Sequence, residues 1–252
     1  EELERAKIDP EDFVGYNRDL YDGSIRGLDA EIGRLMQKLR DIGLADKTLV
    51  VFTGDHGEEF LEHGRTFHGQ STYGELGNVP LILWGAGVPR GTVVEDTVQD
   101  VDLYPTLLEM SRLAVPPGAQ GHSLAPLLAP PPGRARHDEP AITEKAETHE
   151  VGGAPPPRDT ASVAIVSGGF KLVHNLKRPR GGPEFELFDH RKDPLDRADV
   201  ALEHPEVVER LAKDLAAWSK MADAARLKPD RETAAALKAE DLERLRALGY
   251  IQ

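Results

Sequence analysis

Residues 48–60 read TLVVFTGDHGEEF, an unbroken apolar run that ends in an aspartate and a histidine held between two glycines. A run that is apolar at every position, without alternation, is typical of a strand buried on both faces, as in a parallel α/β sheet. Turns after such strands usually contain Gly, Pro or Asn, whereas Asp55 and His56 are also potential metal ligands. The stretch is therefore either a turn or a site.

The segments around this strand predict alternating helices and strands. Residues 19–42 carry apolar side chains three and four positions apart, which is the spacing of one face of an amphipathic helix, and Gly43 is placed to end it. A second apolar run, VPLILW at 79–84, predicts another buried strand. Residues 100–113 predict a helix that Asp100 could cap. This alternation predicts an α/β fold with a mainly parallel sheet.

The proline-rich segment APPPGRARHDE at 129–139 predicts a boundary between two units. We expect residues 1–130 to form part of an α/β domain and residues 131–252 to form a smaller subdomain. Within the subdomain, Ser-Gly-Gly at 167–169 predicts a hairpin.

Two amphipathic helices are expected to close the chain, the second near residues 237–248. The first has an apolar face formed by Val207, Val208, Leu211, Leu215 and Trp218. The charged stretch DHRKDPLDRAD at 189–199 is interpreted as a solvated turn.

Composition argues against several classes of function. The 252 residues carry a formal charge of −13, and nucleic acids and anionic membranes are usually bound by clustered Lys and Arg, so neither is expected as a partner. No apolar stretch approaches the roughly 20 residues of a membrane-spanning helix, so no membrane span is expected. The sequence contains no cysteine, which excludes disulfides, thiolate metal sites and a cysteine nucleophile within these residues.

Asp55 and His56 would lie at the carboxyl end of the TLVVF strand, where ligands bind in open α/β sheets. A carboxylate oxygen and an imidazole nitrogen together suit Ca²⁺, Mg²⁺, Mn²⁺ or Zn²⁺, and Gly54 and Gly57 permit a sharp backbone between them. Two ligands cannot hold a metal alone, so others must come from elsewhere in the fold. The alternative is that Asp55 caps the next turn and His56 is a partly buried, hydrogen-bonded histidine.

Two further histidines follow in EHGRTFHGQS at 62–71. We interpret His68, which precedes Gly69 and the second apolar run, as the candidate general acid or anion-binding residue beside the metal. His63 is interpreted as structural or exposed. Other candidates receive ordinary interpretations: a loop residue for His122, a strand position for His174, and a solvent-facing strand lysine for Lys171.

Five segments, taken together, resemble the second half of the catalytic domain of sulfatases, in the alkaline phosphatase superfamily. They occur in the family's order and are YDGSIRGLDAEIGRLMQKLRDIGLADKTLVVFTGDHGEEF, FHGQSTYGELGNVPLILWG, DVDLYPTLLEM, GHSLAPLL and ELFDHRKDPLDRADV. The resemblance covers roughly residues 15–200. It implies part of an alkaline-phosphatase-like, mainly parallel sheet flanked by helices, followed by a small subdomain with a four-stranded antiparallel sheet and helices.

The resemblance also implies roles for individual residues. Asp55 and His56 would bind an active-site divalent cation, most often Ca²⁺ in sulfatases, and His68 would contact the sulfate or the leaving-group oxygen. The implied reaction is hydrolysis of a small-molecule or glycan sulfate ester. The alternative is hydrolysis of a phosphate or phosphonate ester, or phospho-group transfer, on the same scaffold. Family members are often exported, which favours a periplasmic or secreted location.

The sequence departs from the family's pattern in two features that precede residues 19–42 in family members. The family's nucleophile is a Cys or Ser converted to formylglycine within Cys/Ser-x-Pro-x-Arg, and a pair of adjacent aspartates supplies further metal ligands; neither feature occurs here. We therefore expect these residues to be the C-terminal part of a longer sulfatase-like protein and to be inactive in isolation. A non-catalytic fragment or binding module is the alternative. Self-association through an exposed sheet edge is also expected.

Overall fold

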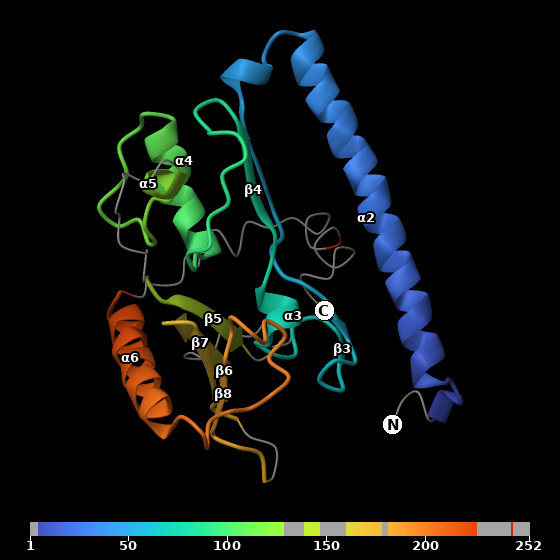
Figure 1. Cartoon of the computed structure of the whole chain (residues 1–252), viewed down its shortest axis with the longest axis vertical. Helices are drawn as coiled ribbons and strands as arrows, with labels where there is room; N and C mark the ends of the chain where they lie inside the picture. The colour runs from blue at the N-terminus through green and yellow to red at the C-terminus, as the bar shows by residue number, and fades with distance from the viewer. Residues whose placement is uncertain (1–4, 129–138, 147–159, 178–180, 226–242, 244–252) are drawn as a thin grey trace.

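The computed structural model describes residues 5–128, 139–146, 160–177, 181–225 and 243. A long helix, α2, runs beside a two-stranded ribbon. A four-stranded sheet with a helix against it lies at one end of that ribbon (Figure 1). A small hairpin and a short helix connect these two parts. No helix among these residues is long and apolar enough to cross a membrane.

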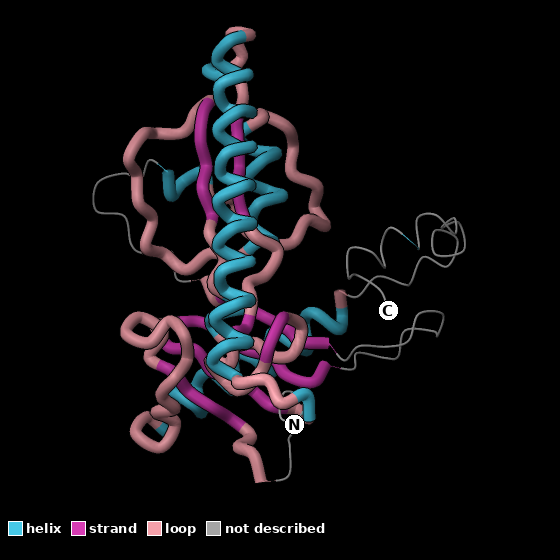
Figure 2. The backbone as a smooth tube through the Cα atoms, turned by 90° about the vertical axis from the view of Figure 1, so that its right-hand side faces the viewer, coloured by secondary structure: helices cyan, strands magenta, loops and turns pink. Residues whose placement is uncertain are grey.

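The helix α2 (Pro10–Asp41) begins earlier than the sequence predicts. The predicted start at residue 19 overlooks Asp9, whose Oδ1 accepts a hydrogen bond from the backbone N–H of Glu11 at 2.8 Å and so caps the helix. The helix ends as predicted, because Gly43 adopts a φ of +69° and donates its N–H to the carbonyl of Arg40. None of its side chains is buried, and it runs lengthwise along the ribbon (Figure 2).

The ribbon consists of β1 (Leu49–Thr53) and β4 (Leu81–Gly85), which pair antiparallel. Their apolar runs predict parallel strands, so the direction of this pair differs from the prediction. The reason is that a continuous apolar run indicates burial on both faces and carries no information on strand direction. No parallel pair occurs among the described residues.

Short elements precede, join and follow the two strands. In chain order they are η1 (Ala45–Lys47), β2 (Glu59–Phe60), β3 (Thr66–Phe67), α3 (Gly74–Gly77), η2 (Asp100–Asp102), α4 (Leu103–Met110) and α5 (Ala125–Leu128). The strands β2 and β3 form an antiparallel hairpin. The predicted cap at Asp100 is displaced by one residue, because Gln99 caps η2 and its N–H donates to Asp102.

The predicted antiparallel sheet is formed by four strands in the order β5-β6-β7-β8. They are β5 (Ala141–Ala146), β6 (Thr160–Ser167), β7 (Phe170–Asn175) and β8 (Phe185–Phe188). The predicted hairpin is confirmed: Gly168 and Gly169 join β6 to β7, and both adopt positive φ values of 63° and 86°. Glycine tolerates this left-handed conformation without steric cost.

The helix α6 (Pro205–Ala224) covers one face of this sheet. Leu211 and Leu215 of the helix are buried against Leu172 and Leu187 of the sheet, so the predicted apolar face is confirmed. The helix expected near residues 237–248 and most of the proline-rich linker lie outside the described residues. The division into residues 1–130 and 131–252 therefore remains a proposal.

The opposite face of the same sheet is also covered. Val173 and Phe188 are buried there, and the ring of Tyr73 from the segment before α3 packs edge-on against Phe188. Because side chains alternate between the two faces of a strand, Lys171 lies on this face with Val173, opposite Leu172. The sheet is thus enclosed between α6 and the segment that leads into α3.

Candidate functional site

The two predicted metal ligands lie directly after β1, on an open surface. The ring Nδ1 of His56 lies 2.9 Å from the carbonyl oxygen of Gly57, which can only accept, so Nδ1 carries a hydrogen and the neutral ring leaves its lone pair on Nε2. That Nε2 lies 3.8 Å from Oδ2 of Asp55. The two side chains are 43% and 64% exposed, so both can reach a ligand from solvent.

His68 joins these residues from the end of β3. Its ring stacks on the ring of His56, with centroids 4.3 Å apart and 29° between the planes. The backbone turns sharply here, since Phe67 and Gly69 both adopt positive φ values, of 67° and 78°. The structure therefore brings all three predicted site residues together, although they come from two sides of the β2–β3 hairpin.

Two carboxylates near these residues were missed from the sequence. Glu58 lies with Oε1 3.3 Å from Nδ1 of His68, and Thr53 donates a hydrogen bond to Oδ1 of Asp100 at 3.4 Å. Burial raises the pKa of Asp100; the bond from Thr53 opposes this rise and the nearby charge of Asp55 adds to it. Glu58 could have been found from its place beside the Asp-His pair, whereas Asp100 offered no signal beyond a helix start.

The arrangement fits part of a metal site. Asp55 and His56 offer an oxygen and a nitrogen on one open surface, which suits a divalent cation. Within the described ranges, however, no group of three or more His, Asp or Glu side chains is arranged to hold a metal ion. Two ligands are too few to hold a metal ion, so the assignment of Asp55 and His56 as metal ligands stays a prediction.

The predictions for two residues outside this cluster, His63 and Lys171, have different outcomes. His63 is structural, as interpreted: its Nδ1 lies 2.5 Å from Glu75 and its Nε2 lies 2.8 Å from the carbonyl of Asp196. Lys171 is not solvent-facing as predicted; it is 2% exposed and its Nζ lies 2.5 Å from the buried carboxylate of Asp196. The prediction fails because it assumed that one face of the sheet is open to water.

The stretch at 189–199 forms the turn that the sequence predicts, and most of its residues are exposed, but it also carries the buried Asp196. The other two histidines that were interpreted from the sequence agree with their interpretations. His122 lies in a loop, where its backbone N–H donates to Asp102, and His174 lies in β7, where its ring stacks on Phe185.

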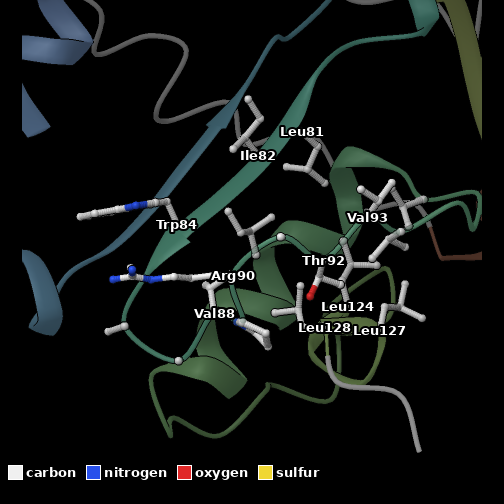
Figure 3. Close-up of a pocket in the computed structure, with 18 of the residues that line it drawn as sticks. Leu81, Ile82, Trp84, Val88, Arg90, Thr92, Val93, Leu124, Leu127 and Leu128 are labelled. Atoms are coloured by element: carbon white, nitrogen blue, oxygen red, sulfur yellow. The ribbon is translucent and has the colours of Figure 1, made fainter. Parts of the chain in front are cut away.

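A large hollow of 800 Å³ lies along β4, away from the cluster. Its walls are mostly apolar and come from β4, the segment 86–94 and the region of α5, as Figure 3 shows for Leu81, Val93 and Leu127. The residues that line it include none of Asp55, His56 and His68. Its chemistry is that of a packing surface, and we do not assign it to the candidate site.

The sequence is similar to known proteins over most of its length. The sequence matches the sulfatase family over residues 3–112, and the family described as N-sulphoglucosamine sulphohydrolase, C-terminal, over residues 62–221. It is 31% identical over 187 residues to arylsulfatase K of Xenopus laevis, a match that covers 74% of this chain and 34% of that protein. The chain thus spans about a third of the length of the curated relatives it matches.

Two solved structures share the fold. One is a protein in complex with its substrate D-glucosamine-2-N,6-O-disulfate, 25% identical, with a TM-score of 0.61 over 82% of this chain and 41% of that one. The other is a phosphonate monoester hydrolase from Silicibacter pomeroyi, 26% identical, with a TM-score of 0.61 over 79% of this chain and 39% of that one. These structures confirm the predicted fold class.

The fold is that of the alkaline phosphatase superfamily. Within it, the chain belongs to the sulfatase family.

Proposed function

We propose that this chain supplies part of the cation site and the leaving-group residue of a sulfate-ester hydrolase. The observation that carries the proposal is the convergence of Asp55, His56 and His68 on one open surface, in a chain of the sulfatase family. Because the chain spans about a third of its curated relatives, the activity is proposed for the parent protein that includes the other parts of the site.

The ligand-bearing residues would act through charge. Asp55 and the free Nε2 of His56 would contribute two ligands to a divalent cation, with Ca²⁺ as the first candidate and Mg²⁺, Mn²⁺ or Zn²⁺ as alternatives. Such an ion neutralises the charge of a sulfate group and favours the ionised form of a nucleophile. Asp55, an exposed carboxylate at the end of the strand, would help to orient the sulfate group through the cation that both contact.

His68 would act on the departing oxygen. Its Nδ1 faces the carboxylate of Glu58, which accepts a hydrogen bond and holds the ring in place. In the doubly protonated ring, Nε2 also carries a hydrogen and is the atom that would donate a proton to the leaving-group oxygen, which leaves a neutral ring with its hydrogen on Nδ1. Stabilising charge that develops on this oxygen lowers the barrier to cleavage of the ester bond.

The nucleophile would come from outside these 252 residues. The sequence has no Cys and no Ser-x-Pro-x-Arg motif, so none of its residues matches the family's formylglycine position. We propose that a formylglycine hydrate in the parent protein performs the attack, and that the isolated chain does not turn over substrate. A sulfated sugar is the first candidate substrate, because a similar structure contains D-glucosamine-2-N,6-O-disulfate.

A second candidate is hydrolysis of a phosphonate ester. It is favoured by the similarity to the phosphonate monoester hydrolase, which matches this chain with the same TM-score of 0.61. The two candidates are separated by assaying the parent protein on 4-nitrophenyl sulfate and on a 4-nitrophenyl phosphonate under identical conditions. The proposal predicts the larger kcat/KM on the sulfate; a larger value on the phosphonate would replace it with the second candidate.

A further inference from the structure

His63 lies in the segment 54–73 that carries the candidate site, which we call the site loop. Both of its ring nitrogens face acceptors: Glu75 Oε1 lies 2.5 Å from Nδ1, and the carbonyl oxygen of Asp196 lies 2.8 Å from Nε2. A backbone carbonyl can only accept, and the carboxylate of Glu75 in its ionised form can only accept, so beside that form the ring donates from both nitrogens. An imidazole that donates twice is the charged imidazolium.

Asp196 contacts two partners at once because of its backbone conformation. It adopts a φ of +54°, in the left-handed region where Asp is one of the residues most often found. Its carbonyl accepts from His63 of the site loop, while its buried carboxylate accepts from Lys171 of β7. The residue therefore joins the site loop to the enclosed face of the four-stranded sheet.

The turn that contains Asp196 contacts the chain just after the site loop at two more points. Asn78 donates its side-chain amide to the carbonyl of Pro194 at 2.5 Å. A Cβ added to Gly74 would overlap that same carbonyl, so the two backbones meet in direct contact. The ring of His63 stacks on Tyr73, with centroids 3.8 Å apart, and the hydroxyl of Tyr73 bonds to Glu186 of β8.

We propose that His63 is a positioning residue, which as a doubly donating imidazolium docks the site loop, and with it Asp55, His56 and His68, onto the turn at residues 193–196. The residue interpreted from the sequence as a structural neighbour of the site thus fixes the site's place on the subdomain. Any effect of this docking on turnover rests on the proposed function, whereas the docking itself does not.

The charges around His63 favour this form. Glu75 and Asp196 are the acidic groups at its ring, Glu59 lies near it in the site loop, and Lys171 neutralises the carboxylate of Asp196. Arg65 is the cation near Tyr73 and Glu59. Burial lowers the pKa of His63, but its hydrogen bonds to Asp196 and Glu75 outweigh this, and the pKa is raised above its ordinary value.

Two measurements on the full-length protein test the docking directly. The first is the protonation state of the His63 ring at pH 7, read from its two ¹⁵N chemical shifts. The second is amide hydrogen exchange in His63→Gln and, as the matched control, in His122→Gln, whose exposed side chain lies in a loop. We expect two protonated nitrogens, and exchange about tenfold faster in residues 54–73 of His63→Gln but not in β6, β7 or α6.

Each other outcome overturns the proposal. A neutral His63 ring at pH 7 removes the doubly donating form, and this reading does not depend on whether the variant folds. Unchanged exchange in His63→Gln, or an equal increase across all peptides, shows that the residue does not dock this loop in particular. If the unmodified parent fails to hydrolyse sulfate esters while the loop exchanges as expected, the proposed function fails and the docking stands.

Glu75→Gln provides an independent check of the pair. This variant keeps the size of the side chain but removes the negative charge of one of the two acceptors, which weakens the hydrogen bond from Nδ1, so we expect faster exchange of the site loop there as well. If His63 and Glu75 act as one unit, the double variant should exchange little faster than either single variant. A double variant whose increase equals the product of the two single increases would show that the residues act separately, and would contradict the proposal.

Discussion

The rings of His56 and His68 lie stacked with centroids 4.3 Å apart, although a hairpin separates the two residues in the chain. The contact joins His56, in the segment after β1, to His68, which directly follows β3. It therefore places a candidate proton donor within reach of a group bound at Asp55 and His56. The account of function depends on this convergence, and the predictions below test its parts.

Asp55 is expected to be a cation ligand in the parent protein. Replacing it with Asn preserves its size but removes its charge, so Ca²⁺ affinity should fall by more than the ~10- to 100-fold that loss of an outer-shell partner costs. Isothermal titration with Ca²⁺ measures the change. Asp46→Asn, in η1 at the opposite end of β1, is the matched control and should bind as the unmodified protein does. Equal affinity in Asp55→Asn would remove this residue from the site.

Lys171 is expected to hold the enclosed face of the sheet. Its removal in Lys171→Met would leave the carboxylate of Asp196 buried without its cation, which costs about 3–5 kcal/mol of unfolding free energy. Burial lowers the pKa of Lys171 and Asp196 opposes that effect, as expected for a lysine ion pair enclosed by protein.

The control for this change is a lysine–aspartate ion pair at the surface. Lys192 is 84% exposed and lies 2.6 Å from Asp189, so Lys192→Met should cost at most about 1 kcal/mol. Urea unfolding of both variants gives the comparison. Similar costs for the two substitutions would mean that the Lys171 pair contributes no more than an exposed one.

Stability should depend on pH through His63. Its pKa in the folded protein is raised above the ordinary value near 6.5, so its contribution is fully present below about pH 6.5 and is lost as the pH rises through the higher folded value. The difference in unfolding free energy between the unmodified protein and His63→Gln should therefore shrink from pH 6 to higher pH. A difference that grows with pH would show that the folded ring favours its neutral form.

The sequence allowed the site to be predicted where the signal was local. Asp55, His56 and His68 lie within one stretch after an apolar strand, and the structure brings them together. The roles of Lys171 and Asp196 depend on contacts across the fold, since His63 and Asp196 are 133 positions apart. A lysine in an antiparallel strand is buried or exposed according to what covers that face of the sheet. The residues of β7 alone do not predict which segment covers it.

The same reasoning explains the strand direction. The residues of β1 and β4 indicate two buried strands, and both exist, but an apolar run has the same appearance in either direction. Asp100 was missed for a related reason. Its contact with Thr53 arises only because η2 folds back beside the end of β1.

The most direct test of the account is the hydrolysis of a sugar sulfate ester, followed as released sulfate, by the parent protein and by its His68→Ala variant. Loss of a group that donates to the leaving oxygen should lower kcat by roughly 10²- to 10⁴-fold, with a smaller effect on 4-nitrophenyl sulfate, whose leaving group needs no protonation. His122→Ala should retain the kcat of the unmodified protein. A His68→Ala variant that retains this kcat, or a parent protein that leaves sulfate esters intact, would contradict the assignment.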